Sequence, residues 1–586
     1  MNLFKFGRET NIINAIIIVV TSLMSFVALE SLVLEFFTIK SSLWLLSLIH
    51  LVFSSYILYK RKIVPVKEWE CKLIGWDIAA IVMSLAATFG FSVYYYTLDL
   101  SVRFETSDPA IHFFLSKKFA QTSHLALTST DLFPFQHLST YPFLDYVNTG
   151  LLMKVFYFID NINVYMVGNL FLFSLTILLI YALLKEFIKY DLFIFISMMV
   201  LACTGYNLNS VIWGFSSQMA GIIMILSLLL INKTLKNKID RGVYLSLVAL
   251  HVLGVLFAYY YFAPVILASV VIQELVIRKK INIRSLFCLE NIVYVGSFVV
   301  FAYIYLVHFG SNIENGNISS VKLEGYITRD LYSTFAPLLL FAVFVTLNWI
   351  KERKFEFILI LLSCLLLFAG IILIAGLQGY ASSYYFYKNH FVIGLLLIIL
   401  YAIGLSKVKE KSKALYISYV ICILFFTLQY TWFDKYINQK NALFNPVAPN
   451  YVGQVFTINK IKLNQTEVIL NGEEKAILNE IKNNKALYLN GADYLPVLGG
   501  SLQLLWFEIS TEIWPSYDDR TLYALFDETV KMDIKKWEQD PLKNPYLLVI
   551  GGKGREAFSE RADISHYKII FSTKSKSTVL YKYFSN

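Results

Sequence analysis

The sequence predicts a mostly α protein, a polytopic bundle of membrane helices with a small α/β domain at its C-terminal end. The 586 residues are 57% hydrophobic and 16% charged, whereas soluble domains carry about 25% charged residues, and the mean hydropathy is +0.59. Long apolar stretches recur from the N-terminus to about residue 431. Short helical and strand-like patterns follow them. This composition excludes an ordinary cytosolic enzyme and a disordered chain.

The membrane part contains about 13 stretches that can cross the hydrocarbon layer, which takes about 20 mostly apolar residues per helix. The predicted spans are residues 11–29, 42–59, 75–96, 162–184, 191–207, 211–231, 242–258, 261–277, 290–308, 331–349, 356–376, 390–406 and 414–431. Glu30 and Glu35 follow the first span without a small-residue cleavage pattern. We therefore expect that span to remain as a membrane anchor and not to be removed as a signal peptide.

Lysine and arginine residues in the short loops predict the orientation, because they gather on the cytoplasmic side of membrane proteins. With the N-terminus in the cytoplasm, basic clusters such as those at 60–72, 233–241 and 278–284 fall on that side. The C-terminal domain then lies outside the cytoplasm, and the protein belongs in the plasma membrane. The formal net charge of +10 reflects this topology, so a nucleic-acid partner has no support.

Two domains are expected: a membrane domain over 1–434, with an outward loop at 98–151, and an extracytoplasmic α/β domain over 435–586. In the second domain the spacing of apolar residues predicts a helix at 473–481. Strands are predicted at 486–489, 546–550, 567–571 and 578–583, the last two as a hairpin. The glycine-rich segment 551–554 lacks the Walker spacing, so we expect a plain turn there and not a phosphate loop.

The outward loop contains a predicted helix start at Asp108 and Pro109, since a carboxylate and a proline are typical of the first positions of a helix. The apolar residues that follow predict a helix along the membrane surface. His112 lies one turn from Asp108 on the same side and is a further candidate catalytic residue. A carboxylate held there suits a general base that takes the proton of an acceptor hydroxyl, and one carboxylate is enough for an inverting displacement. The alternative is that Asp108 only caps the helix.

Carboxylates, imidazoles and aromatic rings alternate further along the same loop. The candidate substrate-binding residues there are Asp131, His137, Tyr141 and Asp145. Such residues suit sugar recognition, because aromatic rings stack on the CH faces of a sugar while polar groups bind its hydroxyls. They equally suit a loop folded on the bilayer, with tyrosine and phenylalanine as interface anchors.

A second group of candidates lies at the outward ends of two later spans. It consists of Arg329, Tyr380, Tyr384, Lys388 and His390. The cations among them are suited to clamp a lipid phosphate, since a cation placed in advance stabilises the charge that develops on a leaving polyprenyl phosphate. The alternative is a belt of interfacial tyrosines with a snorkelling lysine.

In its layout the sequence resembles the C-type (GT-C) glycosyltransferase superfamily, the multi-pass enzymes that use polyprenyl-phosphate sugars. The resemblance lies in the predicted spans, in the acidic loop segment from Glu105 to His112 and in the C-terminal α/β domain. It implies that Asp108 is the catalytic base, with Glu105 as the reserve. The residues that correspond loosely to the phosphate-binding cations of the family are Lys388, His390 and Arg329.

The sequence departs from the family layout in one respect. Three predicted helices precede the acidic loop, where the family usually has one. Either the first two helices form an added hairpin, or Glu30 and Glu35 mark the true site. No tandem Asp-x-Asp or Trp-Trp-Asp signature occurs in the sequence, which disfavours an oligosaccharyltransferase.

The resemblance implies an inverting glycosyltransferase that moves a sugar from a polyprenyl-phosphate donor to an extracytoplasmic acceptor. The acceptor would be a cell-envelope glycan, a teichoic-type polymer, a lipid or a protein. No cofactor is assigned, a divalent cation (Mg or Mn) is left open, and no residue is assigned as a metal ligand. The alternatives are a polysaccharide or lipid flippase or exporter, and a non-enzymatic envelope scaffold. Charged residues deep in the spans are scarce, which argues against an ion-coupled carrier.

Overall fold

The computed structural model describes the helical bundle, part of the loop after the third helix, and most of the C-terminal region. The described residues are 12–60, 75–104, 107–125, 141–189, 210–236, 238–278, 287–308, 356–411, 468–492, 494–515, 544–562 and 564–584, with the single positions 192, 194, 198, 343, 345 and 347.

The chain is a multi-pass membrane protein, as predicted. Seven of the described helices are long and apolar enough to cross a membrane. They are α1 (Ile12–Phe36), α3 (Gly75–Tyr95), α6 (Asn161–Phe187), α9 (Ser216–Thr234), α10 (Arg241–Tyr259), α16 (Phe357–Leu377) and the segment Tyr384–Gly404 of α17 (Ser383–Lys411). The shorter apolar helices are α2 (Leu43–Lys60), α11 (Ala263–Arg278) and α13 (Leu289–Ala302), which continues as the π-helix η3 (Tyr303–His308).

Each of these helices coincides with a predicted span. The predicted spans at 191–207, 331–349 and 414–431 lie outside the described residues except for a few single positions. α17 begins at Ser383 and not at residue 390, so Lys388 lies inside the helix and not in the loop before it. The orientation of the bundle stays a prediction from the charge pattern.

The bundle is arranged around α9. In its most apolar window, 94% of the residues of α9 are buried, compared with 22% for α3 and 33% for α16. α9 packs against α6, α10 and α1, so its apolar surface is covered by other helices. The outward faces of α3 and α16 expose side chains such as Val82, Phe89 and Leu367. Exposed apolar faces of this length suit contact with lipid chains.

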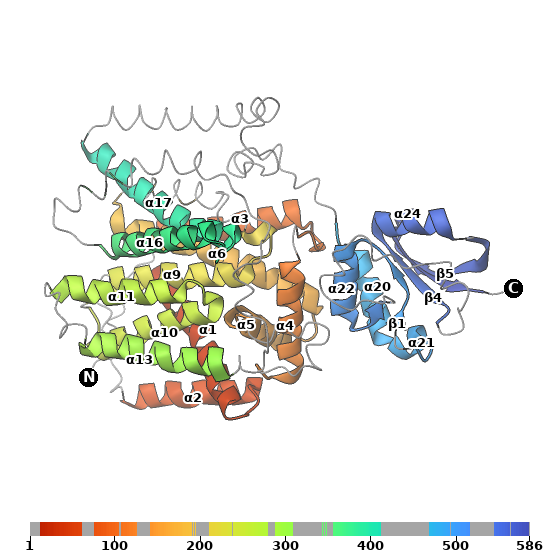
Figure 1. The fold of residues 1–586 in the computed structure, drawn as a ribbon, viewed down its shortest axis with the longest axis horizontal. Coiled ribbons are helices and arrows are strands. Elements are labelled where there is room, and N and C mark those ends of the chain that lie inside the picture. The colour runs from red at the N-terminus through yellow and green to blue at the C-terminus, as the bar shows by residue number, and fades with distance from the viewer. Residues whose placement is uncertain are drawn as a thin grey trace.

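Two helices of the loop after α3 lie across one end of the bundle. They are α4 (Asp108–Thr122) and α5 (Leu144–Val155). Figure 1 shows α4 running across the direction of the long helices, between the bundle and the C-terminal region. The sequence predicted a helix lying on the membrane surface, but residues on most sides of α4 are buried, among them Ile111, Phe113 and Phe114. α4 is therefore enclosed by protein.

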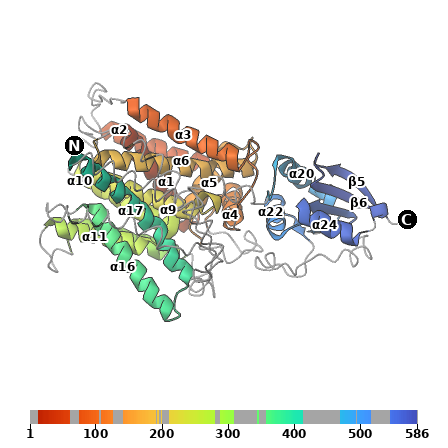
Figure 2. The same cartoon turned by 90° about the horizontal axis from the view of Figure 1, so that it is seen from above.

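The C-terminal region contains a four-stranded sheet in the order β2-β4-β6-β5, with β2 and β4 parallel and the other pairs antiparallel. Its elements are α20 (Gly472–Asn483), α21 (Lys485–Leu489), β1 (Tyr494–Leu495), β2 (Val497–Leu498), α22 (Ser501–Thr511), β3 (Trp514–Pro515), β4 (Tyr546–Ile550), α24 (Gly551–Arg561), η8 (Ile564–His566), β5 (Tyr567–Ser572) and β6 (Thr578–Tyr583). In both views α22 is the element of this region that lies nearest α4 (Figures 1 and 2).

The predictions for this region are partly confirmed. The helix at 473–481 and the strands at 546–550, 567–571 and 578–583 are present, the last two as a hairpin. The strand predicted at 486–489 is wrong, because this segment is helix α21; a short apolar run does not distinguish the two by itself. The turn predicted at 551–554 is also wrong. Gly551 has a left-handed φ of +70°, which leads the chain from β4 directly into α24.

The close packing of α4 on α5 gives a first prediction. A Cβ atom on Gly150 would lie 2.7 Å from the Ser116 carbonyl oxygen and 2.9 Å from the ring of Phe119. We expect Gly150→Ala to force the two helices apart and to lower the unfolding free energy by about 1–3 kcal/mol. Gly90→Ala, where nothing lies within 4 Å, is the control. Thermal unfolding in detergent measures both, and an equal Tm for the two variants would contradict this packing.

Candidate active site

The first turn of α4 is placed by a close contact with the turn before α9. Gly214 in that turn has a left-handed φ of +67°. A Cβ atom there would lie 2.0 Å from Cγ of Pro109, the second residue of α4, and 3.1 Å from the ring of Phe104. Only glycine allows this approach without strain. The contact therefore fixes the start of α4, and with it Asp108.

Asp108 is the first residue of α4 and does not cap it. Ser107 is the N-cap, and no side chain makes a capping hydrogen bond there. The cap predicted at Asp108 is therefore wrong by one position. A carboxylate that is not used for capping keeps its oxygens for another role. Burial raises the pKa of Asp108 above its usual value, and the positive charge of Lys388 acts in the opposite direction.

Lys388 reaches this end of the bundle from α17 and is 6% exposed. Its ammonium lies 4.4 Å from the ring centre of Tyr384, 4.7 Å from that of Phe215 and 5.1 Å from that of Tyr259. Such aromatic faces stabilise a cation. Within the described part of the chain, no carboxylate oxygen forms an ion pair with Lys388 at 4 Å or less. Asp108 and Lys388 are thus close enough to interact electrostatically but are not in direct contact.

His112 lies beside these two groups. Its Nδ1 atom is 3.3 Å from Oγ of Ser217 and 4.0 Å from Oδ2 of Asp145, and its ring meets that of Tyr141 edge-on at 5.1 Å. Burial, and after it the charge of Lys388, lowers the pKa of His112 to about 3. The imidazole is therefore neutral near pH 7 and serves as a hydrogen-bonding group and not as a cation.

Asp145 is 3% exposed, and its Oδ2 atom lies 4.0 Å from Nδ1 of His112. Burial raises the pKa of Asp145 to about 6, against the effect of the neighbouring Ser216 and Thr149 hydroxyls. The sequence proposed Asp145 as a substrate-binding residue. In the structure it is a buried neighbour of His112, and its substrate-binding role stays a prediction.

Two tyrosines complete the arrangement. Tyr141 is half-buried and lies near Asp108, and its pKa is raised by desolvation and then by the charges of Asp108 and Tyr384. Tyr384 packs against Lys388 on the same helix. The structure therefore brings together Asp108, His112, Tyr141, Tyr384 and Lys388, which the sequence proposed from two segments far apart in the chain.

His390 and Tyr380, two other proposed residues, are not among these contacts. His390 follows Lys388 by two positions, which is about 200° around a helix, and its Nδ1 lies 3.0 Å from the carbonyl oxygen of Phe386 on its own helix. Tyr380 is 67% exposed in the connection between α16 and α17. The proposed residues outside the described part of the chain are Glu105, Asp131, His137 and Arg329.

Glu30 and Glu35, the alternative site, have different partners. Glu35 accepts a hydrogen bond of 2.7 Å from the backbone N–H of Leu125 and lies 3.1 Å from Nδ1 of His124, just beyond the C-terminal end of α4. That end is about 22 Å from Asp108, since α4 has 15 residues. Glu30 faces His50 at 3.4 Å. Both glutamates hold elements together and lie away from the group around Asp108.

Sequence reasoning did not identify Phe215, Ser217 and Tyr259, which surround Lys388 and His112. The run of aromatic residues from Tyr259 to Phe262 was the available signal. It marks a short connection between α10 and α11. The described residues contain no group of three or more His, Cys, Asp or Glu side chains that could hold a metal ion. The divalent cation (Mg or Mn) that the sequence left open is not assigned to any residue.

No family model and no curated protein matches the chain. Among solved structures, the chain is similar to ArnT from Cupriavidus metallidurans, determined with bound undecaprenyl phosphate. The match covers 86% of this chain and 98% of that chain, at 12% sequence identity and a TM-score of 0.46. At this level of similarity we base the function on the site residues and not on the match.

The contact at Gly214 can be tested. Gly214→Ala combines a left-handed backbone with a collision against Pro109. We expect a larger loss of stability than from Gly491→Ala, which has a left-handed φ of +82° but open space around it and should cost about 1–2 kcal/mol. Thermal unfolding of both variants is the measurement. A loss for Gly214→Ala no greater than that of the control would show that α4 is not fixed by this turn.

Proposed function

We propose that the protein is an inverting membrane glycosyltransferase that moves a sugar from a polyprenyl-phosphate donor to an acceptor outside the cytoplasm. The observation that supports this proposal is the meeting of Asp108 and Lys388 at one end of the bundle. They are a carboxylate with a raised pKa and a buried ammonium that has no carboxylate partner among the described residues. The reaction needs a carboxylate that takes the acceptor proton and a cation that stabilises the leaving phosphate.

In this reaction Asp108 takes the proton of an acceptor hydroxyl. The acceptor oxygen forms a bond to the anomeric carbon as the bond between that carbon and the phosphate oxygen breaks. The electron pair of the broken bond leaves with the phosphate, and the anomeric carbon is inverted. One carboxylate is sufficient for a direct displacement of this kind, and a raised pKa makes Asp108 a stronger base.

Lys388 interacts with the departing phosphate. The negative charge on that phosphate increases as the bond breaks, so a cation held nearby stabilises the transition state more than the bound donor. The rings of Tyr384, Phe215 and Tyr259 keep the ammonium in place without neutralising it.

The neutral His112 is suited to bind a hydroxyl of the sugar or acceptor. Its Nδ1 faces Ser217 and Asp145, which leaves its Nε2 for such a contact. The ring of Tyr141 meets the imidazole edge-on and is suited to pack against a sugar face. The two residues would hold the acceptor or sugar next to Asp108.

The acceptor class of this proposal is a cell-envelope glycan, a teichoic-type polymer, a lipid or a protein. The protein would act in the plasma membrane, with its N-terminus in the cytoplasm and its C-terminal domain outside, as the charge pattern of the loops predicts. The donor class is the one whose lipid phosphate is bound in the ArnT structure, but the proposal depends on Asp108 and Lys388 and not on that match.

Asp108→Asn tests the base. We expect purified Asp108→Asn protein to transfer sugar from a polyprenyl-phosphate donor about 10²–10⁴-fold more slowly than the wild type, because an amide cannot accept the acceptor proton. Glu556→Gln, an exposed carboxylate on α24, is the matched control and should be fully active. Full activity of Asp108→Asn would remove it as the base. Movement of donor across vesicles without product formation would favour a flippase or exporter instead.

Lys388→Gln tests the cation and has a pH signature. We expect kcat/KM to fall about 10²–10³-fold, as for the loss of one group that stabilises a transition-state charge. Lys388 lowers the pKa of Asp108, so its removal should raise that pKa. Asp108 would then become protonated at a higher pH than in the wild type. The acid limb of the pH profile should therefore move to higher pH.

Lys388→Arg keeps the charge and is the control for this experiment. It should leave the acid limb in place even if kcat/KM falls. An acid limb that does not move in Lys388→Gln would show that Lys388 does not act on the catalytic carboxylate.

A further inference from the structure

The two faces of α4 meet different parts of the protein. Asp108 and His112 lie one turn apart on one side of the helix. Lys117 lies nine positions after Asp108, which places it on the opposite side and about 14 Å along the axis. The first side faces the bundle through Lys388 and Ser217. The second side faces α22 of the C-terminal region (Figure 2).

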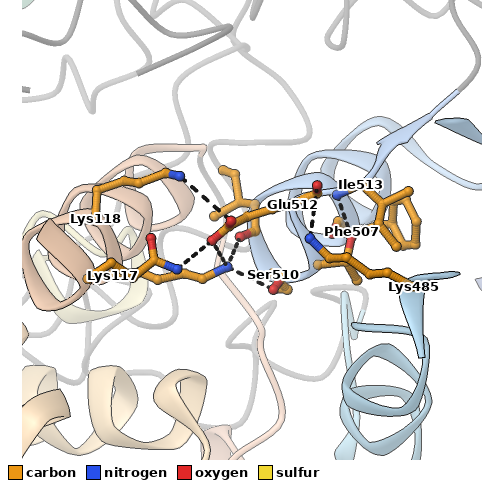
Figure 3. Close-up of polar contacts among 10 residues, drawn as sticks. Lys117, Lys118, Lys485, Phe507, Ser510, Glu512 and Ile513 are labelled. Atoms are coloured by element: carbon orange, nitrogen blue, oxygen red, sulfur yellow. Dashed lines mark hydrogen bonds and ion pairs between the residues drawn. The ribbon is translucent and has the colours of Figure 1, made fainter. Parts of the chain in front are cut away.

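Lys117 is 1% exposed, and each proton of its ammonium has a partner in the C-terminal region. Nζ donates to the carbonyl oxygens of Ile509 and Ser510, both at 2.9 Å, and forms an ion pair of 2.8 Å with Oε1 of Glu512 (Figure 3). The two carbonyl groups belong to the last turn of α22, where a cation is favoured by the helix dipole.

Glu512 is held in position for this contact. It caps the C-terminal end of α22 with a left-handed φ of 56°. Its carboxylate also accepts a hydrogen bond of 2.8 Å from Gln121 and lies 3.7 Å from the ammonium of Lys118, both on α4. Its carbonyl oxygen accepts from Lys485 at 3.2 Å (Figure 3). Although burial acts to raise the pKa of Glu512, the charge of Lys117 lowers it to about 2, so the carboxylate is ionised at physiological pH.

Aromatic packing accompanies the ion pair. Trp506 of α22 is fully buried and stacks on Phe113 of α4 at 5.4 Å between ring centres, with 25° between the planes. It also stacks on Phe104, just before α4, at 6.3 Å. α22 therefore contacts α4 over two turns, from Phe113 to Gln121.

We propose that the C-terminal region positions the catalytic helix through the buried contact of Lys117 with Glu512 and the end of α22, so that sugar transfer depends on this contact. Lys117 and Glu512 are positioning residues and touch no substrate. This proposal rests on the proposed function for its link to catalysis. A purely structural contact would hold the two parts together without changing the rate of transfer.

Glu512→Gln in the full chain is the test, with two readouts. Hydrogen exchange of the α4 backbone should become about 10-fold faster, because the buried ammonium loses its charged partner. The kcat for transfer from a polyprenyl-phosphate sugar should fall about 100-fold, since a shift of the base by about 1 Å is enough for such a loss. The KM for the donor should change less than about 3-fold, because Lys388 is on another helix.

Two variants separate this effect from general loosening. Lys117→Arg keeps a buried cation and should retain most of the kcat. Asn479→Ala removes a contact of 3.0 Å between α20 and Asp160, which joins the C-terminal region to the bundle away from α4. It should leave both the exchange of α4 and the kcat near wild-type values. Lys117→Met should repeat the effect of Glu512→Gln.

The outcomes are distinct. Faster exchange of α4 with unchanged kcat would overturn the proposal, and so would unchanged exchange in Glu512→Gln. A fall in kcat of equal size in Asn479→Ala would also overturn it, since any loosening would then have the same effect. Wild-type protein that transfers no sugar would contradict the proposed function and the link to catalysis. The exchange measurement would still show whether the ion pair holds α4.

Discussion

The position of one helix, α4, is the constraint on which the site depends. α4 does not cross the membrane, so the hydrocarbon layer does not fix its height or direction. Protein contacts do so instead. Gly214 contacts the first turn of α4 and Gly150 of α5 contacts its side. Glu512 pairs with Lys117 on its far face, and Glu35 binds the backbone just beyond its C-terminal end. These contacts come from segments far apart in the chain. They allow Asp108 to reach an end of the bundle without belonging to a span.

The charge states of the side chains around Asp108 follow from their removal from water at this end of the bundle. A carboxylate removed from water is easier to protonate, and an ammonium removed from water attracts any anion that reaches it. Asp108 and Lys388 are placed near each other without direct contact, so neither neutralises the other fully. His112 is kept neutral by the same burial and the same lysine. The site therefore contains a carboxylate, an ammonium and a neutral imidazole side by side.

The sequence predicts the bundle well because hydrophobicity is a local property. The spans at 75–96 and 356–376, for example, match α3 (Gly75–Tyr95) and α16 (Phe357–Leu377) closely. Asp108 is recognisable from the helix start that it shares with Pro109. Tertiary contacts are not encoded locally. Whether Lys388 or His390 faces Asp108 depends on the rotation of α17 about its axis, which the sequence does not give. The contact of Lys117 with Glu512 joins residues almost 400 positions apart, and no local pattern indicates it.

The contact between Lys117 and Glu512 also has a consequence for biosynthesis. Chains are made from the N-terminus, and early segments leave the ribosome long before late ones. α4 emerges almost 400 residues before Glu512, which pairs with its buried lysine. While those residues are being made, the ammonium of Lys117 is without its counter-charge. Only a chain that extends past Glu512 can assemble this part of the protein, so chains terminated before that residue cannot form the finished arrangement.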